Sequence, residues 1–114
     1  MTAISISTHV LDTATGLPAE GVPVSLAWRD DAGAWAELAT GTTDADGRIS
    51  DLATADAALI AGRYRVRFDL ESTGIARASW YPEVSIVVDL AADAGHVHVP
   101  LLLAPYGYTT YRGS

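Results

Sequence analysis

Three histidines, His9, His96 and His98, are the residues of this 114-residue sequence best suited to acid–base catalysis. An imidazole titrates near neutral pH, so it can take a proton from water and later return it to a leaving group. The sequence has no cysteine, no lysine, no G-x-S-x-G nucleophile elbow and no glycine-rich phosphate loop. We therefore expect any catalysis by this chain to combine imidazole acid–base chemistry with a cation.

The alternation of side chains along the strands places all three imidazoles on outward faces. Between residues 4 and 11, His9 shares a polar face with Ser5 and Ser7, opposite apolar side chains. Between residues 96 and 103, His96 and His98 share a face, opposite another apolar set. An outward histidine is ordinarily just solvated. These outward faces are nevertheless partly apolar, which suits burial against another subunit, because they also carry Leu11, Pro100 and Leu102.

A metal site is the alternative interpretation of these histidines. Two imidazoles at positions i and i+2 of a strand converge, and His9 could supply a third ligand, as in three-histidine zinc sites. No acidic partner stands beside His96 and His98 in the sequence. We therefore expect no metal, and keep zinc as the alternative.

Arg48 is the cation that the sequence separates from the other arginines. It directly follows the turn Asp44-Ala45-Asp46-Gly47, which would fix it at the mouth of a sandwich. Spacing alone favours a simple ion pair with a nearby aspartate. Three further arginines alternate along one predicted strand and are expected to form an exposed, solvated stripe: Arg63, Arg65 and Arg67.

The elements that must position these residues are strands, because the dominant period along the chain is two. The pattern predicts strands at residues 4–11, 22–29, 35–43, 62–70, 83–90 and 96–103, with residues 108–114 pairing back onto the His98 strand. Residues 71–80 are the one fair helix candidate. We expect a single all-β domain over residues 1–114, a two-sheet β-sandwich of seven or eight strands with one short helix.

The charge and the apolar segments of the sequence limit the binding partners and the cellular compartment that we expect. The net charge of −7 argues against nucleic acid and anionic membranes. No apolar run approaches the roughly 20 residues that would span a bilayer. The first residues lack the cationic and apolar segments of a signal peptide. We expect a cytoplasmic protein, or a periplasmic one if a leader was removed.

Both ends of the chain resemble the signatures of the 5-hydroxyisourate hydrolases, the transthyretin-related family of purine catabolism. The stretches are ISTHVLDTATGLPAEGVPVSL and HVHVPLLLAPYGYTTYRGS, and DADGR, GRYRVRFDL and WYPEVSIVV also lie where that family has them. The terminal YRGS is highly specific, since transthyretin proper, the hormone carrier, lacks it and the histidine pattern. The chain differs from the family at two positions. Val97 stands where the family usually has an aromatic residue, and Ala104 stands where it usually has a serine. These two differences concern packing or the shape of the pocket.

The resemblance implies a transthyretin-like sandwich, assembled as a homotetramer of two dimers with active sites in the channel between them. It implies hydrolysis of the small molecule 5-hydroxyisourate to the carboxylated ureido-imidazoline OHCU (2-oxo-4-hydroxy-4-carboxy-5-ureidoimidazoline), between urate and allantoin, with no cofactor. The family's catalytic positions fall on His9, Arg48, His98 and Ser114. Its terminal motif falls on Tyr111, Arg112 and Gly113, which are expected to bind substrate.

The end of the chain is expected to be part of this site. The carboxylate of Ser114 would orient an imidazole, and the chain would stop there because its end forms a wall of the pocket. The alternative function is a transthyretin-like module that binds a small planar ligand without turnover. The histidines, Arg48 and the YRGS ending favour the hydrolase.

Overall fold

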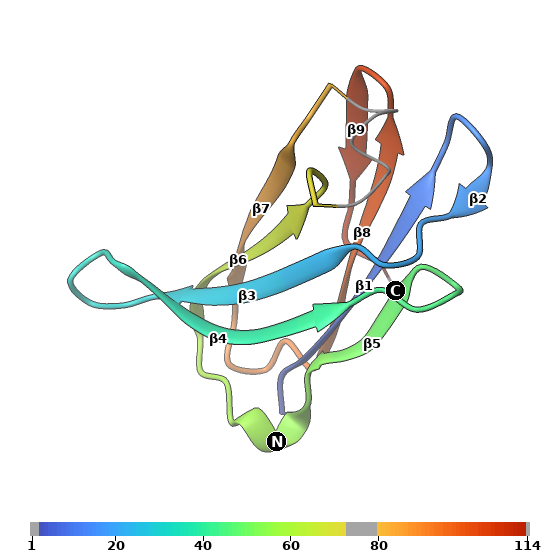
Figure 1. The fold of residues 1–114 in the computed structure, drawn as a ribbon. Coiled ribbons are helices and arrows are strands. Elements are labelled where there is room, and N and C mark those ends of the chain that lie inside the picture. The colour runs from blue at the N-terminus through green and yellow to red at the C-terminus, as the bar shows by residue number, and fades with distance from the viewer. Residues whose placement is uncertain (1–2, 73–79, 114) are drawn as a thin grey trace.

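The computed structural model describes residues 3–72 and 80–113, which form two β-sheets packed face to face (Figure 1). The first sheet runs in the order β2 (Leu17–Pro18), β1 (Ser5–Asp12), β8 (His96–Ala104) and β9 (Gly107–Thr110), and β5 (Arg48–Ala53) also pairs with β1. The second sheet runs in the order β4 (Trp35–Thr42), β3 (Pro23–Arg29), β6 (Gly62–Asp69) and β7 (Glu83–Leu90). The expected all-β, two-sheet sandwich is thereby confirmed.

The observed elements differ from the predicted ones in four places. The two-residue β2 and the short β5 were not predicted, and a 3-10 turn occupies Ala55–Ala57. The last strand ends at Thr110, after which Gly113 alone rejoins β8 through an isolated bridge to His98. The helix candidate at residues 71–80 falls mostly outside the described residues. Within the described part of the chain, no helix is long and apolar enough to cross a membrane.

The pairing of β1 with β8 is parallel and joins the two ends of the sequence. Its register places Ser5 beside His96, Ser7 beside His98 and His9 beside Pro100. A parallel pair needs a long crossover connection, and here the whole second sheet lies within that connection (Figure 1). The outward polar residues of both strands therefore form one continuous surface.

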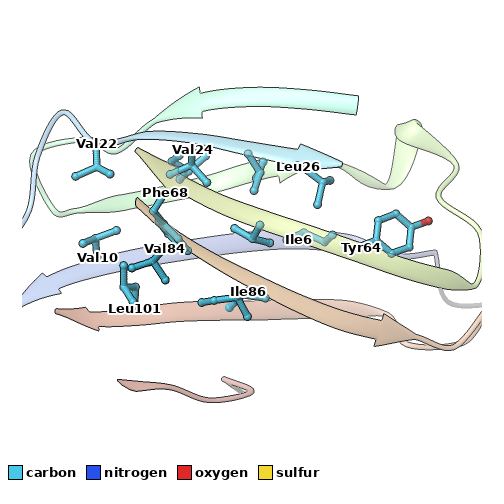
Figure 2. Close-up of a cluster of buried hydrophobic side chains, with 14 of the residues drawn as sticks. Ile6, Val10, Val22, Val24, Leu26, Tyr64, Phe68, Val84, Ile86 and Leu101 are labelled. Carbon is cyan, nitrogen blue, oxygen red and sulfur yellow. The ribbon is translucent and has the colours of Figure 1, made fainter. Parts of the chain in front are cut away.

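The core lies between the sheets and holds this register in place. Figure 2 shows side chains of β3 and β6, among them Leu26 and Phe68, facing Ile6, Val10 and Leu101 of β1 and β8. Phe68, Leu26, Val10 and Leu101 are fully buried, and each such burial contributes about 1.5–3 kcal/mol. A one-residue slip of β1 would turn this apolar set toward solvent, so the core fixes which side chains face outward.

The turn before β5 is stabilised by hydrogen bonds within the turn and by a hydrogen bond to β1. Asp44 Oδ1 accepts hydrogen bonds from the backbone amides of Asp46 and Arg48, each at 2.9 Å. The carbonyl of Gly47 accepts a 2.8 Å hydrogen bond from the amide of Val10. Because the turn is held against β1, Arg48 stands directly opposite His9 in the antiparallel pairing.

Gly47 is the residue of this turn that tolerates least change. Its φ of +73° lies in the left-handed region, and an added Cβ would come within 2.5 Å of the Val10 carbonyl oxygen. We expect Gly47→Ala to lower the free energy of unfolding by about 2 kcal/mol or more. Gly16→Ala is the matched control, because Gly16 has a similar φ of +76° with nothing within 4 Å. It should cost only about 1 kcal/mol in denaturant unfolding, and equal losses in the two variants would contradict the packing argument.

Candidate active site

Three neighbouring strands deliver the chemistry-bearing side chains to one outward face of the first sheet. β5 brings Arg48, β1 brings Ser7 and His9, and β8 brings His96 and His98. The alternation along each strand turns these side chains away from the core, as the sequence predicted for Ser7 and the three histidines. Arg48, expected at the mouth of the sandwich, is the first residue of β5. Ser7 is buried, the rings of His9 and His98 are half-buried, and His96 and Arg48 are exposed.

The hydroxyl of Ser7 bridges the two histidines of β8. Ser7 Oγ lies 2.8 Å from Nδ1 of His98 and 2.9 Å from Nε2 of His96. Ser5 Oγ lies 2.7 Å from the other nitrogen of His96, Nδ1. Within the described residues, Nδ1 is thus the hydrogen-bonded nitrogen of His98. Its Nε2 is the nitrogen left to act on a water or a substrate.

Gly113 holds the His98 ring from the other side. The Gly113 amide donates a 2.9 Å hydrogen bond to the His98 carbonyl. A Cβ built on Gly113 would lie 2.5 Å from His98 Cδ2 and 3.0 Å from Cγ. Only glycine lets the chain pass this close to the imidazole, so Gly113 limits the positions open to the His98 ring. This contact explains in physical terms why the terminal motif contains a glycine.

Arg48 sets the electrostatics of both histidines. Burial first, and the Arg48 charge second, hold the pKa of His98 below its ordinary value of 6.5, and His9 and His96 act in the same direction. The pKa of His9 is also lowered, by burial and then by Arg48, while the Asp46 carbonyl and the carboxylates of Asp44 and Asp46 oppose this. Both imidazoles are therefore neutral at neutral pH, which is the form that can accept a proton.

The guanidinium of Arg48 forms no ion pair with the described residues. The ion pairs there are Arg63 with Asp89 and Arg67 with Glu83. The expected ion pair with a nearby aspartate is not seen there, and Asp44 accepts a hydrogen bond from the backbone amide of Arg48 instead. The ion pairs also correct the expectation of a merely solvated arginine stripe, and the third member, Arg65, lies over the Trp35 ring at 4.8 Å.

A cavity of about 320 Å³ opens on this face. Its lining is Ser7, Thr8, Arg48, Ser50, His96 and His98. A neighbouring cavity of about 400 Å³ shares His98 and is lined also by Tyr111 and Arg112, together with apolar residues of β7 and β8. His98 therefore stands between the two cavities. A neutral imidazole beside a fixed cation in a polar cavity can activate water while the cation stabilises negative charge.

The structure brings some of the predicted site residues together and separates others. Arg48 and His98 share the first cavity, and His9 joins them as the cross-strand neighbour of Arg48. Tyr111 and Arg112 line the second cavity only, and Gly113 lies against His98. Ser114 is outside the described residues. The catalytic and substrate-binding roles of all seven residues remain predictions.

Sequence reasoning missed the roles of Ser7, Ser50 and His96 in lining this cavity. The alternation did place Ser7 on the face of His9, and His96 on the face of His98. The missing information was the parallel register, which sets these two faces beside each other. As for the zinc alternative, no group of three or more His, Cys, Asp or Glu side chains could hold a metal ion within residues 3–72 and 80–113.

Comparisons with known proteins find relatives in both sequence and fold over nearly the whole chain. A sequence model described as the HIUase/Transthyretin family matches residues 6–113. The 5-hydroxyisourate hydrolase of Mus musculus is 43% identical over 112 residues, which cover 96% of this chain and 94% of the mouse protein. The solved structure of Klebsiella pneumoniae 5-hydroxyisourate hydrolase has a TM-score of 0.80 at 39% identity and covers 100% of both chains. Transthyretin from Sparus aurata has a TM-score of 0.85 at 32% identity, over 96% of each chain.

The electrostatic role of Arg48 can be measured directly. In Arg48→Gln the charge that lowers both histidine pKa values is gone, so the pKa of His9 and that of His98 should rise. NMR titration of the imidazole signals measures this shift. Arg29→Gln removes the same charge from the far end of β3 and should move neither value. Unchanged histidine pKa values in Arg48→Gln would contradict the arrangement.

Proposed function

Since this chain belongs to the HIUase/Transthyretin family, we propose that it hydrolyses 5-hydroxyisourate in the cavity shared by Arg48, His96 and His98. Relatives that carry the hydrolase name include a mammalian and a bacterial protein, each matched over 96% of this chain. The enzyme is therefore favoured over a module that only binds ligand. The reaction lies in urate degradation, where the six-membered ring of 5-hydroxyisourate opens to give OHCU.

The observation that carries the assignment of the site is the position of His98. Its Nδ1 is hydrogen-bonded to Ser7, Gly113 passes close beside its ring, and the Arg48 charge acts on it. An imidazole fixed in this way presents Nε2 in one orientation, which is what a general base requires. We assign to Nε2 of His98 the removal of a proton from the attacking water.

The remaining residues take roles that follow from their chemistry. Arg48 is permanently charged and presents a planar fork of donors, so it would bind the substrate carbonyl and stabilise the oxyanion that forms there. His9, the cross-strand neighbour of Arg48, would relay a proton to the leaving nitrogen, giving up its own N–H as its other ring nitrogen takes a proton from water. Ser114 stays a proposed catalytic position, and Tyr111 and Arg112, which line the second cavity, would bind substrate.

We also propose the homotetramer of two dimers that the sequence resemblance implies. Support comes from large side chains in and around β9 that this single chain leaves exposed, among them Tyr106, Tyr108 and Tyr111. Leu11 and Leu102 pair across β1 and β8 on the outward face and are only half-buried. A second pair of subunits laid over this face would bury these residues and close the cavity.

A coupled spectrophotometric assay tests the function. Uricase generates 5-hydroxyisourate from urate, and its absorbance decay is followed with and without the protein. We expect rapid decay with the wild type and a loss of at least about 100-fold in His98→Asn, because removing a general base costs two or more orders of magnitude. Decay at the spontaneous rate with wild-type protein would overturn the hydrolase in favour of the binding module.

A further inference from the structure

Four side chains form one unbroken series of hydrogen bonds across β1 and β8. Ser5 Oγ contacts Nδ1 of His96 at 2.7 Å, Nε2 of His96 contacts Ser7 Oγ at 2.9 Å, and Ser7 Oγ contacts Nδ1 of His98 at 2.8 Å. The parallel register produces the series, because it sets Ser5 beside His96 and Ser7 beside His98. One end, at His98, faces the cavity, which His96 also lines, and the other end is the half-buried Ser5, which is not part of that lining.

Counting protons shows that this series has two matched states. The Ser7 hydroxyl has a single hydrogen, and each neutral imidazole has one N–H. If Ser7 donates to His96 Nε2, then Nδ1 carries the proton in both rings. If Ser7 donates to His98 Nδ1, then Nε2 carries the proton in both rings. Ser7 is buried, only 8% exposed, and the described residues offer its hydroxyl no third partner.

We propose that Ser5, His96, Ser7 and His98 form a proton wire that converts His98 between its base and acid tautomers during catalysis. This inference rests on the proposed function and gives His96 and Ser7 a part in it. Both act through His98, so they are positioning and relay residues.

The transfer along the wire balances atom by atom. His98 Nε2 takes a proton from water, and the proton on His98 Nδ1 moves to Ser7 Oγ. The original hydroxyl proton of Ser7 moves to His96 Nε2, and the proton on His96 Nδ1 moves to Ser5 Oγ. The hydroxyl proton of Ser5 leaves to solvent. Five bonds to hydrogen break and five form, so one proton has travelled from the attacking water to solvent and both rings end neutral. The same transfers in reverse restore the base tautomer after the product leaves: Nε2 of His98 releases its proton to water, and Ser5 takes one from solvent.

The chemistry of the reaction gives such a wire a purpose. Ring opening turns a cyclic amide into a carboxylic acid and a ureido group. The ureido nitrogen is not basic and keeps only one of the two protons of water, while the acid ionises at neutral pH. One proton per neutral substrate must therefore leave the site. Burial and the Arg48 charge both disfavour a cationic His98, and a wire lets the proton leave without forming that cation.

The tautomers themselves provide a test that needs no substrate. Nitrogen-15 NMR of protein labelled at histidine distinguishes Nδ1–H from Nε2–H in each ring. We expect His96 and His98 to carry their protons on the same-named nitrogen and to interconvert together in the wild type. Ser7→Ala should remove this coupling, whereas Ser25→Ala, on the second sheet, should preserve it. Opposite tautomers in the two rings of the wild type would overturn the wire.

Kinetics tests whether catalysis uses the wire. His96→Gln keeps a side chain that can donate and accept hydrogen bonds but cannot relay a proton by changing tautomer. We expect His96→Gln and Ser7→Ala to lower kcat about tenfold or more, with KM changed by less than about threefold. The dependence of kcat on deuterium fraction should be curved in the wild type, because several protons move together, and linear in the variants.

The outcomes separate this inference from the proposed function. A kcat within about twofold of wild type in His96→Gln would overturn the wire. A lower kcat with the same curved deuterium dependence would also overturn it, because the loss would then be structural. If the wild type itself left the spontaneous decay unchanged, the proposed function would fail, and with it the catalytic role of the wire, whatever the tautomers showed.

Discussion

The parallel pairing of β1 with β8 is the constraint on which the site depends. It brings the two ends of the chain together and sets Ser5 and Ser7 beside His96 and His98 in one register. The apolar side chains beneath it, including Ile6 and Leu101, fix that register because a slip of one residue would expose them. The same pairing lets β5 lie against the free edge of β1, which places Arg48 opposite His9. Core packing and site geometry are therefore two consequences of one strand pair.

Charge and burial act together on this arrangement. Arg48 lines the cavity and has no carboxylate partner among the described residues. Here it acts on two half-buried imidazoles and, with their burial, keeps both neutral. Neutral rings can exchange protons with water, and a cation beside them can receive developing negative charge. The second sheet makes a contrast, since its arginines Arg63 and Arg67 are neutralised by ion pairs on an exposed face.

Much of this could be predicted from the sequence. The alternation along residues 4–11 and 96–103 correctly placed His9, His96 and His98 outward, because burial of apolar residues decides which face a side chain takes. The neighbours of those strands could not be predicted in the same way. Strands at opposite ends of a chain pair only when the whole sandwich closes, and no local pattern records their register. Ser7 and His96 were therefore left without a role. β5 was missed because its six residues alternate too weakly to be distinguished from a loop.

The central claim is that imidazoles kept neutral by burial and by Arg48 perform the hydrolysis. The most direct test is to measure how kcat/KM for 5-hydroxyisourate depends on pH, after correction for spontaneous decay. This parameter reports the ionisations of the free enzyme. The account predicts that activity falls on the acid side with a pKa below the ordinary 6.5 of histidine, matching the value that NMR titration gives for His98. An acid limb at or above 6.5, or activity independent of pH across that range, would contradict it.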